Sequence, residues 1–113
     1  MFPKKYTRSA VMLDNKVLGY LGLAKKAGLL ADGTESVVAS VRGNKSKLVI
    51  LACDASATTV KKVTDKCGYY NVKLVTAGTM SVLGNALGRE LTACVSVNDE
   101  KFAEVIGKFV ITN

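Results

Sequence analysis

The stretch Lys45-Ser46-Lys47-Leu48-Val49-Ile50-Leu51-Ala52-Cys53-Asp54-Ala55-Ser56 indicates how this chain folds. Its five apolar residues from Leu48 to Ala52 show no polar alternation, which is the pattern of a strand that helices bury on both faces. Asp54 and Ser56 follow where the next helix should begin, and such a strand–helix junction places a binding edge at the strand's carboxyl end. The sequence contains no histidine and shows no metal-ligand cluster or nucleophile–base pair nearby, so we expect this edge to bind rather than to catalyse.

Helical and extended patterns alternate on both sides of this strand. Apolar residues at helical spacing predict helices within residues 17–27, 34–42, 57–70, 82–87 and 100–109, and extended segments are predicted at 29–31, 47–53, 72–76 and 92–97. Asp14 or Asn15, Ser56, and Asn98 or Asp99 are expected to cap helices, and Asp32-Gly33-Thr34-Glu35 predicts a capping box. The alternation predicts an α/β sandwich in which helices cover both faces of a sheet of about four strands.

Length, charge and cysteine usage indicate a single basic domain of a cytoplasmic protein. The 113 residues suffice for one core, with residues 1–15 as a flexible basic tail and residues 16–113 as the domain. The net charge is +7, and residues 16–73 hold ten basic and four acidic residues, which favours a polyanionic partner. No segment resembles a signal peptide or a membrane span, and the three widely spaced cysteines are expected to be reduced thiols, without metal.

Several motifs occur in order along the chain and together resemble a known family. They are Leu21-Gly22-Leu23-Ala24-Lys25-Lys26-Ala27-Gly28, Gly33 with Glu35, the stretch from Lys47 to Ser56, Thr64-Asp65-Lys66-Cys67-Gly68-Tyr69-Tyr70-Asn71-Val72, Leu83-Gly84-Asn85-Ala86-Leu87-Gly88 and Asp99-Glu100-Lys101-Phe102-Ala103. Over about residues 16–107 the chain resembles the bacterial YlxQ-type branch of the ribosomal protein L7Ae/L30e family. The resemblance implies a three-layer α/β/α sandwich with a mixed sheet, and a monomer that binds structured RNA such as kink-turns or ribosomal RNA, without cofactor, small-molecule substrate, membrane or catalysis.

In that family RNA is held at one edge by two elements. The first is the start of the second helix, with the archaeal pattern Gly-Thr-Asn-Glu-x-x-Lys after two lysines, and the second is a strand–helix loop nearer the carboxyl end. Gly33 and Thr34 match the pattern, whereas Glu35, Ser36 and Ala39 stand at the Asn, Glu and Lys positions, and Ala31 and Asp32 replace the preceding lysines. The loop maps to about Thr76–Ser81. The resemblance implies the RNA-binding residues Lys25, Lys26, Gly33, Thr34, Glu35, Ser36, Ala77, Gly78 and Thr79.

The departures from the pattern leave a second function open. An ionised Glu35 can only accept hydrogen bonds and repels phosphate, whereas asparagine both donates and accepts. The chain could therefore be a protein-interaction module that docks on ribosomal or RNA-processing partners and contacts RNA weakly, although the positive charge of residues 16–73 opposes this. An enzyme that uses Asp54 as a phosphoacceptor is disfavoured, because no acidic pair precedes it to hold magnesium.

The remaining basic and aromatic residues are expected to have less specific roles. Lys61, Lys62 and Lys66 should form the solvated face of a helix, with Lys62 far from the RNA edge. Arg42, Lys45 and Lys47 should supply general electrostatic attraction at the opposite end of the second helix. Tyr69 and Tyr70 could stack on bases, but one of them is expected in the core.

Overall fold

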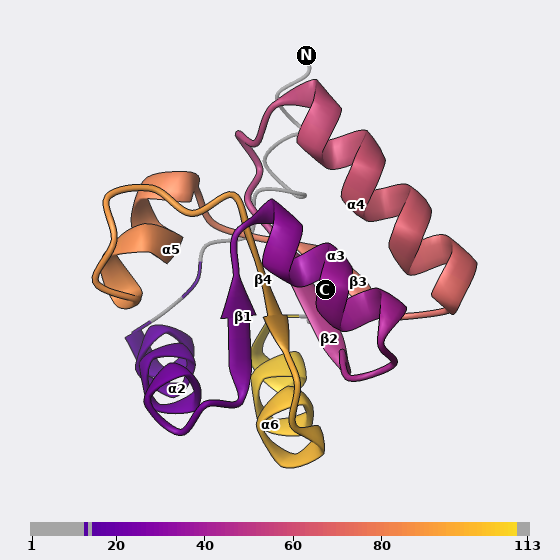
Figure 1. The fold of residues 1–113 in the computed structure, drawn as a ribbon. Helices are drawn as coiled ribbons and strands as arrows, with labels where there is room; N and C mark the ends of the chain where they lie inside the picture. The colour runs from indigo at the N-terminus through magenta and orange to yellow at the C-terminus, as the bar shows by residue number, and fades with distance from the viewer. Residues whose placement is uncertain (1–12, 14, 111–113) are drawn as a thin grey trace.

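The computed structural model describes Leu13 and residues 15–110, whose path is shown in Figure 1. In this part of the chain the elements follow in the order α2 (Asn15–Lys26), β1 (Leu30–Asp32), α3 (Thr34–Arg42), β2 (Leu48–Leu51), α4 (Ala57–Tyr70), β3 (Leu74–Thr76), α5 (Met80–Ala86), β4 (Cys94–Val97) and α6 (Glu100–Val110). Each element overlaps a segment that the sequence predicted, so the expected α/β order is confirmed. Most of the expected tail, residues 1–15, lies outside the described residues, as does the predicted cap Asp14.

The sheet is mixed, with the strand order β1-β4-β2-β3. β2 and β3 are parallel, with Val49 opposite Leu74, whereas β4 is antiparallel to both of its neighbours, β1 and β2. β1, β2 and β3 therefore point in the same direction, and their carboxyl ends share one edge of the sheet with the amino end of β4. α3, α4 and α5 all begin at this edge.

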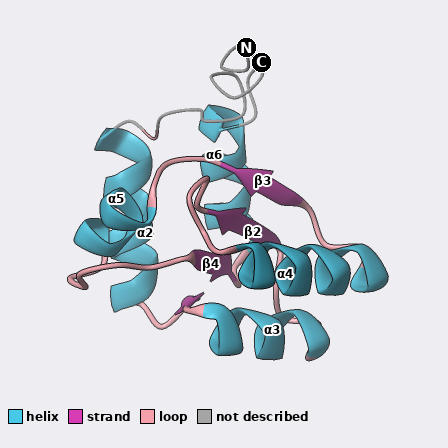
Figure 2. Ribbon diagram, turned by 90° about the horizontal axis from the view of Figure 1, so that it is seen from above, coloured by secondary structure: helices cyan, strands magenta, loops and turns pink. Residues whose placement is uncertain are grey.

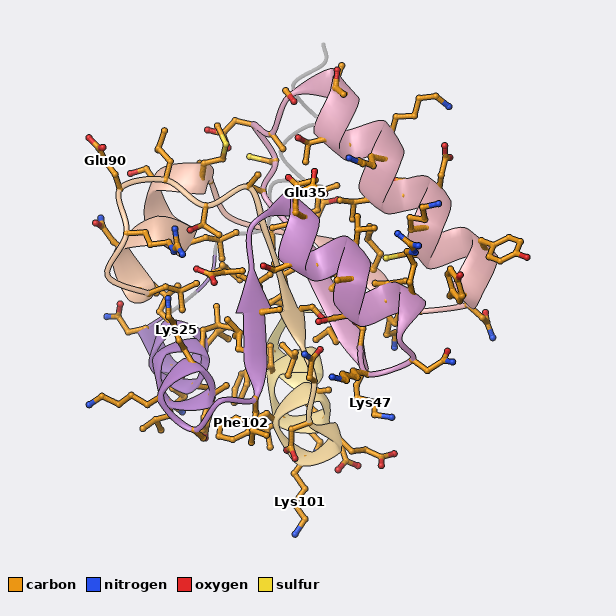
Figure 3. All side chains as sticks on the ribbon, viewed as in Figure 1. Lys25, Glu35, Lys47, Glu90, Lys101 and Phe102 are labelled. Carbon is orange, nitrogen blue, oxygen red and sulfur yellow. The ribbon has the colours of Figure 1, made fainter. Side chains whose placement is uncertain are left out.

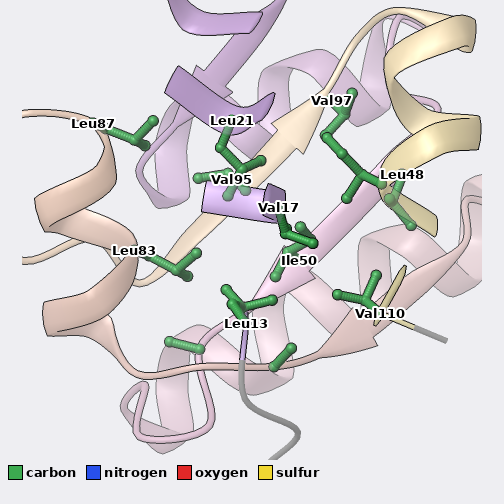
Figure 4. Close-up of a cluster of buried hydrophobic side chains, with 13 residues drawn as sticks. Leu13, Val17, Leu21, Leu48, Ile50, Leu83, Leu87, Val95, Val97 and Val110 are labelled. Atoms are coloured by element: carbon green, nitrogen blue, oxygen red, sulfur yellow. The ribbon is translucent and has the colours of Figure 1, made fainter. Parts of the chain in front are cut away.

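Helices cover both faces of the sheet and make the three layers visible in Figure 2. On one face, α2, α5 and α6 bury a cluster around Leu48 and Ile50 (Figure 4), and on the other, α3 and α4 bury a cluster around Val49 and Leu51. Successive residues of β2 thus enter different halves of the core. This arrangement explains why the central apolar run of the sequence shows no alternation.

β4 is more deeply buried than its alternating apolar residues Ala93, Val95 and Val97 suggest. All four residues of Cys94–Val97 are buried, because this strand is central in the sheet and has helices on both faces. Ser96 is fully buried, and its hydroxyl forms hydrogen bonds with Ser46 Oγ at 2.7 Å and Asn98 Oδ1 at 2.6 Å. These contacts satisfy a polar group inside the core.

Local signals at the helix ends agree with most of the predicted caps. Ser56 Oγ accepts a hydrogen bond from the Thr59 amide at 3.2 Å, and Asp99 Oδ2 accepts one from the Phe102 amide at 3.0 Å. Asn71 ends α4 in the left-handed conformation, with φ of 58°. The side chains at these positions stop or start helices without help from the core.

Candidate nucleic-acid interface

The end of the sheet where β1, β2 and β3 finish and β4 begins is the candidate edge, which we define as segments 32–36, 53–56, 77–80 and 88–93. Backbone hydrogen bonds connect them: the Cys53 amide donates to Gly78 O at 2.8 Å, and the Thr92 amide donates to Met80 O at 3.0 Å. The Gly33 amide donates at 3.0 Å to the carbonyl oxygen of Cys94, the residue directly after segment 88–93. The structure thus brings the predicted segments 33–36 and 77–79 to one edge. However, they follow the two outer strands, so about 14 Å of sheet width separates them.

Gly33 turns the chain from β1 into α3. Its backbone, with φ of 95° and ψ of 152°, lies in a region that residues with a side chain rarely adopt. Crowding is not the reason for glycine, because a Cβ here would meet no atom within 4 Å. The backbone conformation therefore requires glycine, and it leaves open space beside the first turn of α3.

Thr34 follows this turn, and its side chain contacts the buried thiol of Cys94. Burial raises the pKa of Cys94 to about 11, and the hydrogen bond from Thr34 lowers it by a smaller amount. Thr34 is half-buried, whereas Glu35, Ser36 and Ala39 are exposed on the first two turns of α3. The two positions that match the family pattern therefore form the turn, and the three that depart from it face solvent.

The predicted capping box at the start of α3 is wrong. The N-cap residue is Gly33, and no side chain caps the helix. Asp32 precedes the N-cap residue, and its carboxylate accepts no hydrogen bond from the amides of the helix. Glu35 does not return to the cap either, because its Oε2 lies 3.1 Å from Lys62 Nζ of α4.

Asp32 instead holds two cations that come from different elements. Its Oδ2 lies 2.6 Å from Nε of Arg89, in the loop after α5, and 3.4 Å from Nζ of Lys25, in the last turn of α2. The Asp32 side chain is only 12% exposed. The predicted site residue Lys25 therefore reaches the candidate edge with its charge paired, whereas its neighbour Lys26 is exposed and makes no ion pair within the described residues.

Residues 88–93 form a part of the candidate edge that the sequence analysis missed. Beneath this loop lies Gly84 of α5, where a Cβ would be 2.8 Å from the Glu90 carbonyl oxygen and 2.9 Å from Leu91 Cα. Glu90 and Leu91 are exposed, and Figure 3 shows Glu90 at the same end of the molecule as Glu35. The available signal was the motif 83–88, which directly precedes the loop and contains the glycine that permits this close approach.

The second predicted segment, 77–79, has clear structural roles. Gly78 has φ of 71°, and a Cβ there would lie 2.8 Å from Cδ1 of the buried Leu13, so this glycine is needed for packing. Ala77 is fully buried, and Thr79 Oγ1 caps α5 by accepting a hydrogen bond from the Val82 amide at 3.2 Å. Contact between this segment and RNA stays a prediction.

Asp54 has a structural role at the same edge. Its Oδ1 accepts a hydrogen bond from the Met80 amide at 2.8 Å, so it ties the end of β2 to the start of α5. Among the described residues, no group of three or more His, Cys, Asp and Glu side chains could hold a metal ion. Likewise, no helix in the described part of the chain is both long and apolar enough to cross a membrane.

The candidate edge is close to neutral. Its segments hold Asp32, Glu35, Asp54, Glu90 and Arg89, and with Lys25 and Lys26 of α2 and Lys62 of α4 the set has four carboxylates and four cations. Three of these cations lie 3.4 Å or less from a carboxylate oxygen. The expectation that Lys62 lies far from the edge is wrong, because α3 and α4 pack side by side and bring Lys62 to Glu35.

Known proteins resemble this chain in sequence. A family model described as "Ribosomal protein L7Ae/L30e/S12e/Gadd45 family" matches residues 15–107. The curated "RNA-binding protein YlxQ" of Bacillus subtilis (strain 168) is 43% identical over 83 residues, which are 74% of this chain and 83% of that protein. A protein of the same name from Enterococcus faecium is 47% identical over 57 residues, covering 50% of this chain and 55% of the relative.

Solved structures share the fold. A protein with unknown function from Bacillus halodurans C superposes with a TM-score of 0.82 at 35% identity, over 88% of this chain and all of the other. The Giardia lamblia 15.5kD RNA binding protein superposes with a TM-score of 0.67 at 22% identity, over 86% of this chain and 90% of that one, and supports the fold alone. The comparisons confirm the family resemblance and the sandwich fold, and the names of the family and the relatives agree with the prediction of a protein that is not an enzyme.

Proposed function

This chain belongs to the ribosomal protein L7Ae/L30e/S12e/Gadd45 family, and on that basis we propose that it is a non-catalytic protein that binds structured RNA at the candidate edge. The observation that carries the proposal is the 43% identity, over 74% of the chain, to a relative called an RNA-binding protein. The site geometry supports it, because Gly33 and Thr34 match the family pattern and lie beside the exposed loop 88–93.

Backbone groups at the start of α3 supply the donors for this binding. No side chain caps the helix, and within the described residues the amides of 34–36 donate no hydrogen bond. Such amides at a helix N-terminus suit phosphate oxygens or base-edge acceptors. The open space at Gly33 lets a ribose or base approach them closely.

The RNA is expected to be structured, with a kink or an internal loop, as in kink-turns and ribosomal RNA. A rigid edge built from backbone turns recognises shape better than an unstructured strand. The protein is expected to act as a cytoplasmic monomer, without a cofactor. Glu35 is the residue most opposed to kink-turn binding, since its exposed carboxylate stands at the asparagine position of the pattern.

A protein-docking function is the second candidate, and the near-neutral charge of the candidate edge favours it. Three of the four cations here face carboxylates, so long-range attraction of RNA to this edge is weak. In this case RNA would bind with low affinity and without preference for shape. The two functions can therefore be distinguished by the ratio of the affinity for a kinked RNA to the affinity for an RNA without a kink.

A titration with two RNAs separates these functions. A labelled kink-turn and a fully paired duplex of equal length are titrated by filter binding at about 50 and about 200 mM salt. Our proposal expects tighter binding of the kink-turn at both salt concentrations. Equal affinity for the two RNAs would favour the docking function.

Matched variants then locate the site. Lys26→Glu should weaken kink-turn binding more than Lys101→Glu, because Lys101 lies at the opposite end of the molecule from Glu35 (Figure 3). Both lysines are exposed, so both variants should keep the fold by circular dichroism. An equal loss in the two variants would mean that only net charge matters.

A further inference from the structure

The end of the sandwich opposite the candidate edge carries a concentration of unpaired positive charge. We define this basic end by five cations and one aromatic residue: Arg42, Lys45, Lys47, Lys66, Lys73 and Tyr69. Four of the cations are exposed and Lys66 is half-exposed. Within the described residues, none of the five makes an ion pair or a side-chain hydrogen bond, in contrast to the cations of the candidate edge.

The topology explains why these residues meet. β1 and β2 are parallel, so the helices that follow them, α3 and α4, run back side by side in the same direction, as Figures 1 and 2 show. Their carboxyl-terminal ends therefore lie at the end of the sheet where β2 and β3 start, with Arg42 in the last turn of α3 and Lys66 one turn before the end of α4. Lys47 directly precedes β2 and Lys73 directly precedes β3, and both line one hollow of about 710 Å³.

The backbone that carries Lys45 and Lys47 is held in place by the core. The residue between them, Ser46, is buried, and its Oγ lies 2.7 Å from Ser96 Oγ. The Lys47 amide donates to Val97 O at 2.8 Å, and the Lys45 amide donates to Ser40 O at 3.0 Å. Two lysines are thus presented to solvent from a fixed backbone, which reduces the entropy lost when they bind.

Tyr69 adds an open aromatic surface to this charge. Its side chain is 82% exposed, so its ring is open to a stacking partner. Its ring meets Tyr70 edge-to-face, with centroids 4.9 Å apart, and Tyr70 packs against the core cluster of α3 and α4. Tyr70 therefore supports the Tyr69 ring and leaves most of that ring open.

We propose that the basic end is a second RNA-binding surface, where the cations hold the phosphates of a single-stranded segment and Tyr69 stacks on an unpaired base. Cations that follow a backbone, combined with an aromatic ring that stacks on a base, are the features of single-strand binding sites. The hollow is also lined by Lys101 and by the carboxylates of Asp99, Glu100 and Glu104, and these three carboxylates disfavour phosphate there. The RNA therefore passes over the ends of α3 and α4.

This surface is independent of the candidate edge, so one experiment can test it alone. An oligouridine strand of about ten nucleotides has no kink or internal loop and is titrated by fluorescence anisotropy at several salt concentrations. Lys45→Gln with Lys66→Gln should lower its affinity by about fivefold or more at low salt. The slope of log K against log salt should also become shallower by about 1.4, which corresponds to two lost phosphate contacts on a single strand.

The control variant also removes two positive charges, but from lysines outside the basic end. Lys16→Gln with Lys61→Gln changes two exposed lysines outside the basic end, one of them on the same helix as Lys66. This control should leave the affinity and the slope nearly unchanged. Equal losses in the two double variants, or no loss in either, would overturn the proposal.

Substitutions of Tyr69 test the stacking. Tyr69→Ala should weaken binding of the oligouridine by about tenfold, whereas Tyr69→Phe keeps the ring and should bind like the parent. The high exposure of Tyr69 means that both variants should fold normally, which thermal unfolding can verify. If Tyr69→Ala binds as well as Tyr69→Phe, no base stacks at this position and the proposed binding mode is wrong.

Discussion

The candidate edge and the basic end are opposite ends of one sheet, yet they use charge in opposite ways. At the candidate edge Asp32 and Glu35 form ion pairs with Lys25, Lys62 and Arg89, whereas at the basic end no carboxylate pairs with a cation among the described residues. A paired charge has a weak field beyond about 10 Å in salt, while unpaired charges add together. The net charge of a segment therefore does not indicate where its field is strongest.

The two ends also differ in what they present to a ligand. The candidate edge presents backbone, through the turn at Gly33 and the loop that Gly84 lets approach α5. The basic end presents long side chains and one ring. Contacts from a rigid backbone recognise shape, and contacts from flexible cations supply affinity for phosphate. We expect the first end to select the RNA and the second to strengthen its binding.

The largest effect is expected from Gly84→Ala, which should shift the loop 88–93 and so change RNA binding at the candidate edge but not at the basic end. In Gly84→Ala the new Cβ would lie 2.8 Å from the Glu90 carbonyl oxygen, so the loop must shift. We expect the free energy of unfolding to fall by about 2 kcal/mol, as in an overpacked core, and kink-turn affinity to fall with it. Binding of oligouridine at the basic end should persist. Chemical denaturation and anisotropy measure the two effects.

Gly68→Ala provides the matched control for this change. Gly68 lies within α4, and a Cβ there would meet no atom within 4 Å. Alanine should therefore stabilise the protein by up to about 1 kcal/mol through its helix propensity. If Gly84→Ala is as stable as Gly68→Ala and binds the kink-turn normally, the loop is not part of the site.

The next effect concerns Glu35, whose replacement should make the candidate edge more like the family pattern. Glu35→Asn removes a carboxylate, frees Lys62 and offers an amide, so kink-turn affinity should rise by roughly tenfold. Adding Ala39→Lys, one turn further on the same exposed face, should raise it more. Glu104→Asn removes an exposed carboxylate of α6 at the opposite end, beside the basic end, and should raise kink-turn affinity by less than Glu35→Asn. Unchanged affinity in both edge variants would favour the protein-docking function.

A smaller effect is expected from Asp32→Asn, which leaves cations of the candidate edge unpaired, like those of the basic end. The substitution leaves Lys25 and Arg89 without their carboxylate partner and should lower stability by about 1 kcal/mol. Binding of structured RNA should strengthen by a few-fold at low salt and become more dependent on salt. A shallower salt dependence would mean that the paired Arg89 is held in a conformation that the RNA needs.

The last expected effect is a pH dependence of stability, which arises from one buried thiol in α4 and one beneath the turn at Gly33. Burial raises the pKa of Cys67, in α4, and of Cys94, beneath the turn at Gly33, from 9.0 to about 11. Because the folded state keeps both protons, their contribution to stability is complete below about pH 9 and is lost as the pH rises toward 11. Denaturation curves on either side of this range should show the fall.

A cysteine variant and a labelling experiment check the cause. Cys67→Ala should reduce the fall in stability between about pH 9 and 11, since one ionising group is absent. At neutral pH a thiol reagent should label the half-exposed Cys53 well before the two buried thiols. Equal labelling rates for all three cysteines would contradict the burial that raises the two pKa values.

The accuracy of the sequence predictions depended on how local each signal was. Ser56 and Asp99 cap helices as predicted, because a cap needs only neighbouring backbone groups. The capping box at 32–35 failed because the two carboxylates found cations on other elements, which the local pattern does not reveal. Lys62 was misplaced for the same reason.

The site followed the same division between local and distant signals. Gly33 and Thr34 were chosen because they match the family pattern, whereas the loop 88–93 was missed because Gly33 meets it only through the pairing of β1 with β4. Gly78 was named as an RNA-binding residue from the family resemblance, and in the structure it packs against Leu13, a contact across 65 residues of sequence. The basic residues at the ends of α3 and α4 were dismissed separately because their proximity depends on the parallel course of β1 and β2.

The sequence by itself determined the order of helices and strands, the two-faced burial of β2 and the glycine turn into α3, because hydrophobic period and backbone preference act over a few residues. Only the tertiary structure decided which charges are neutralised and which remain open. Ion pairs depend on distances of a few ångströms between residues far apart in the chain, and the sheet order β1-β4-β2-β3 sets those distances. Among the described residues, the same +7 chain therefore has one edge whose cations are mostly paired with carboxylates and one end whose cations are unpaired.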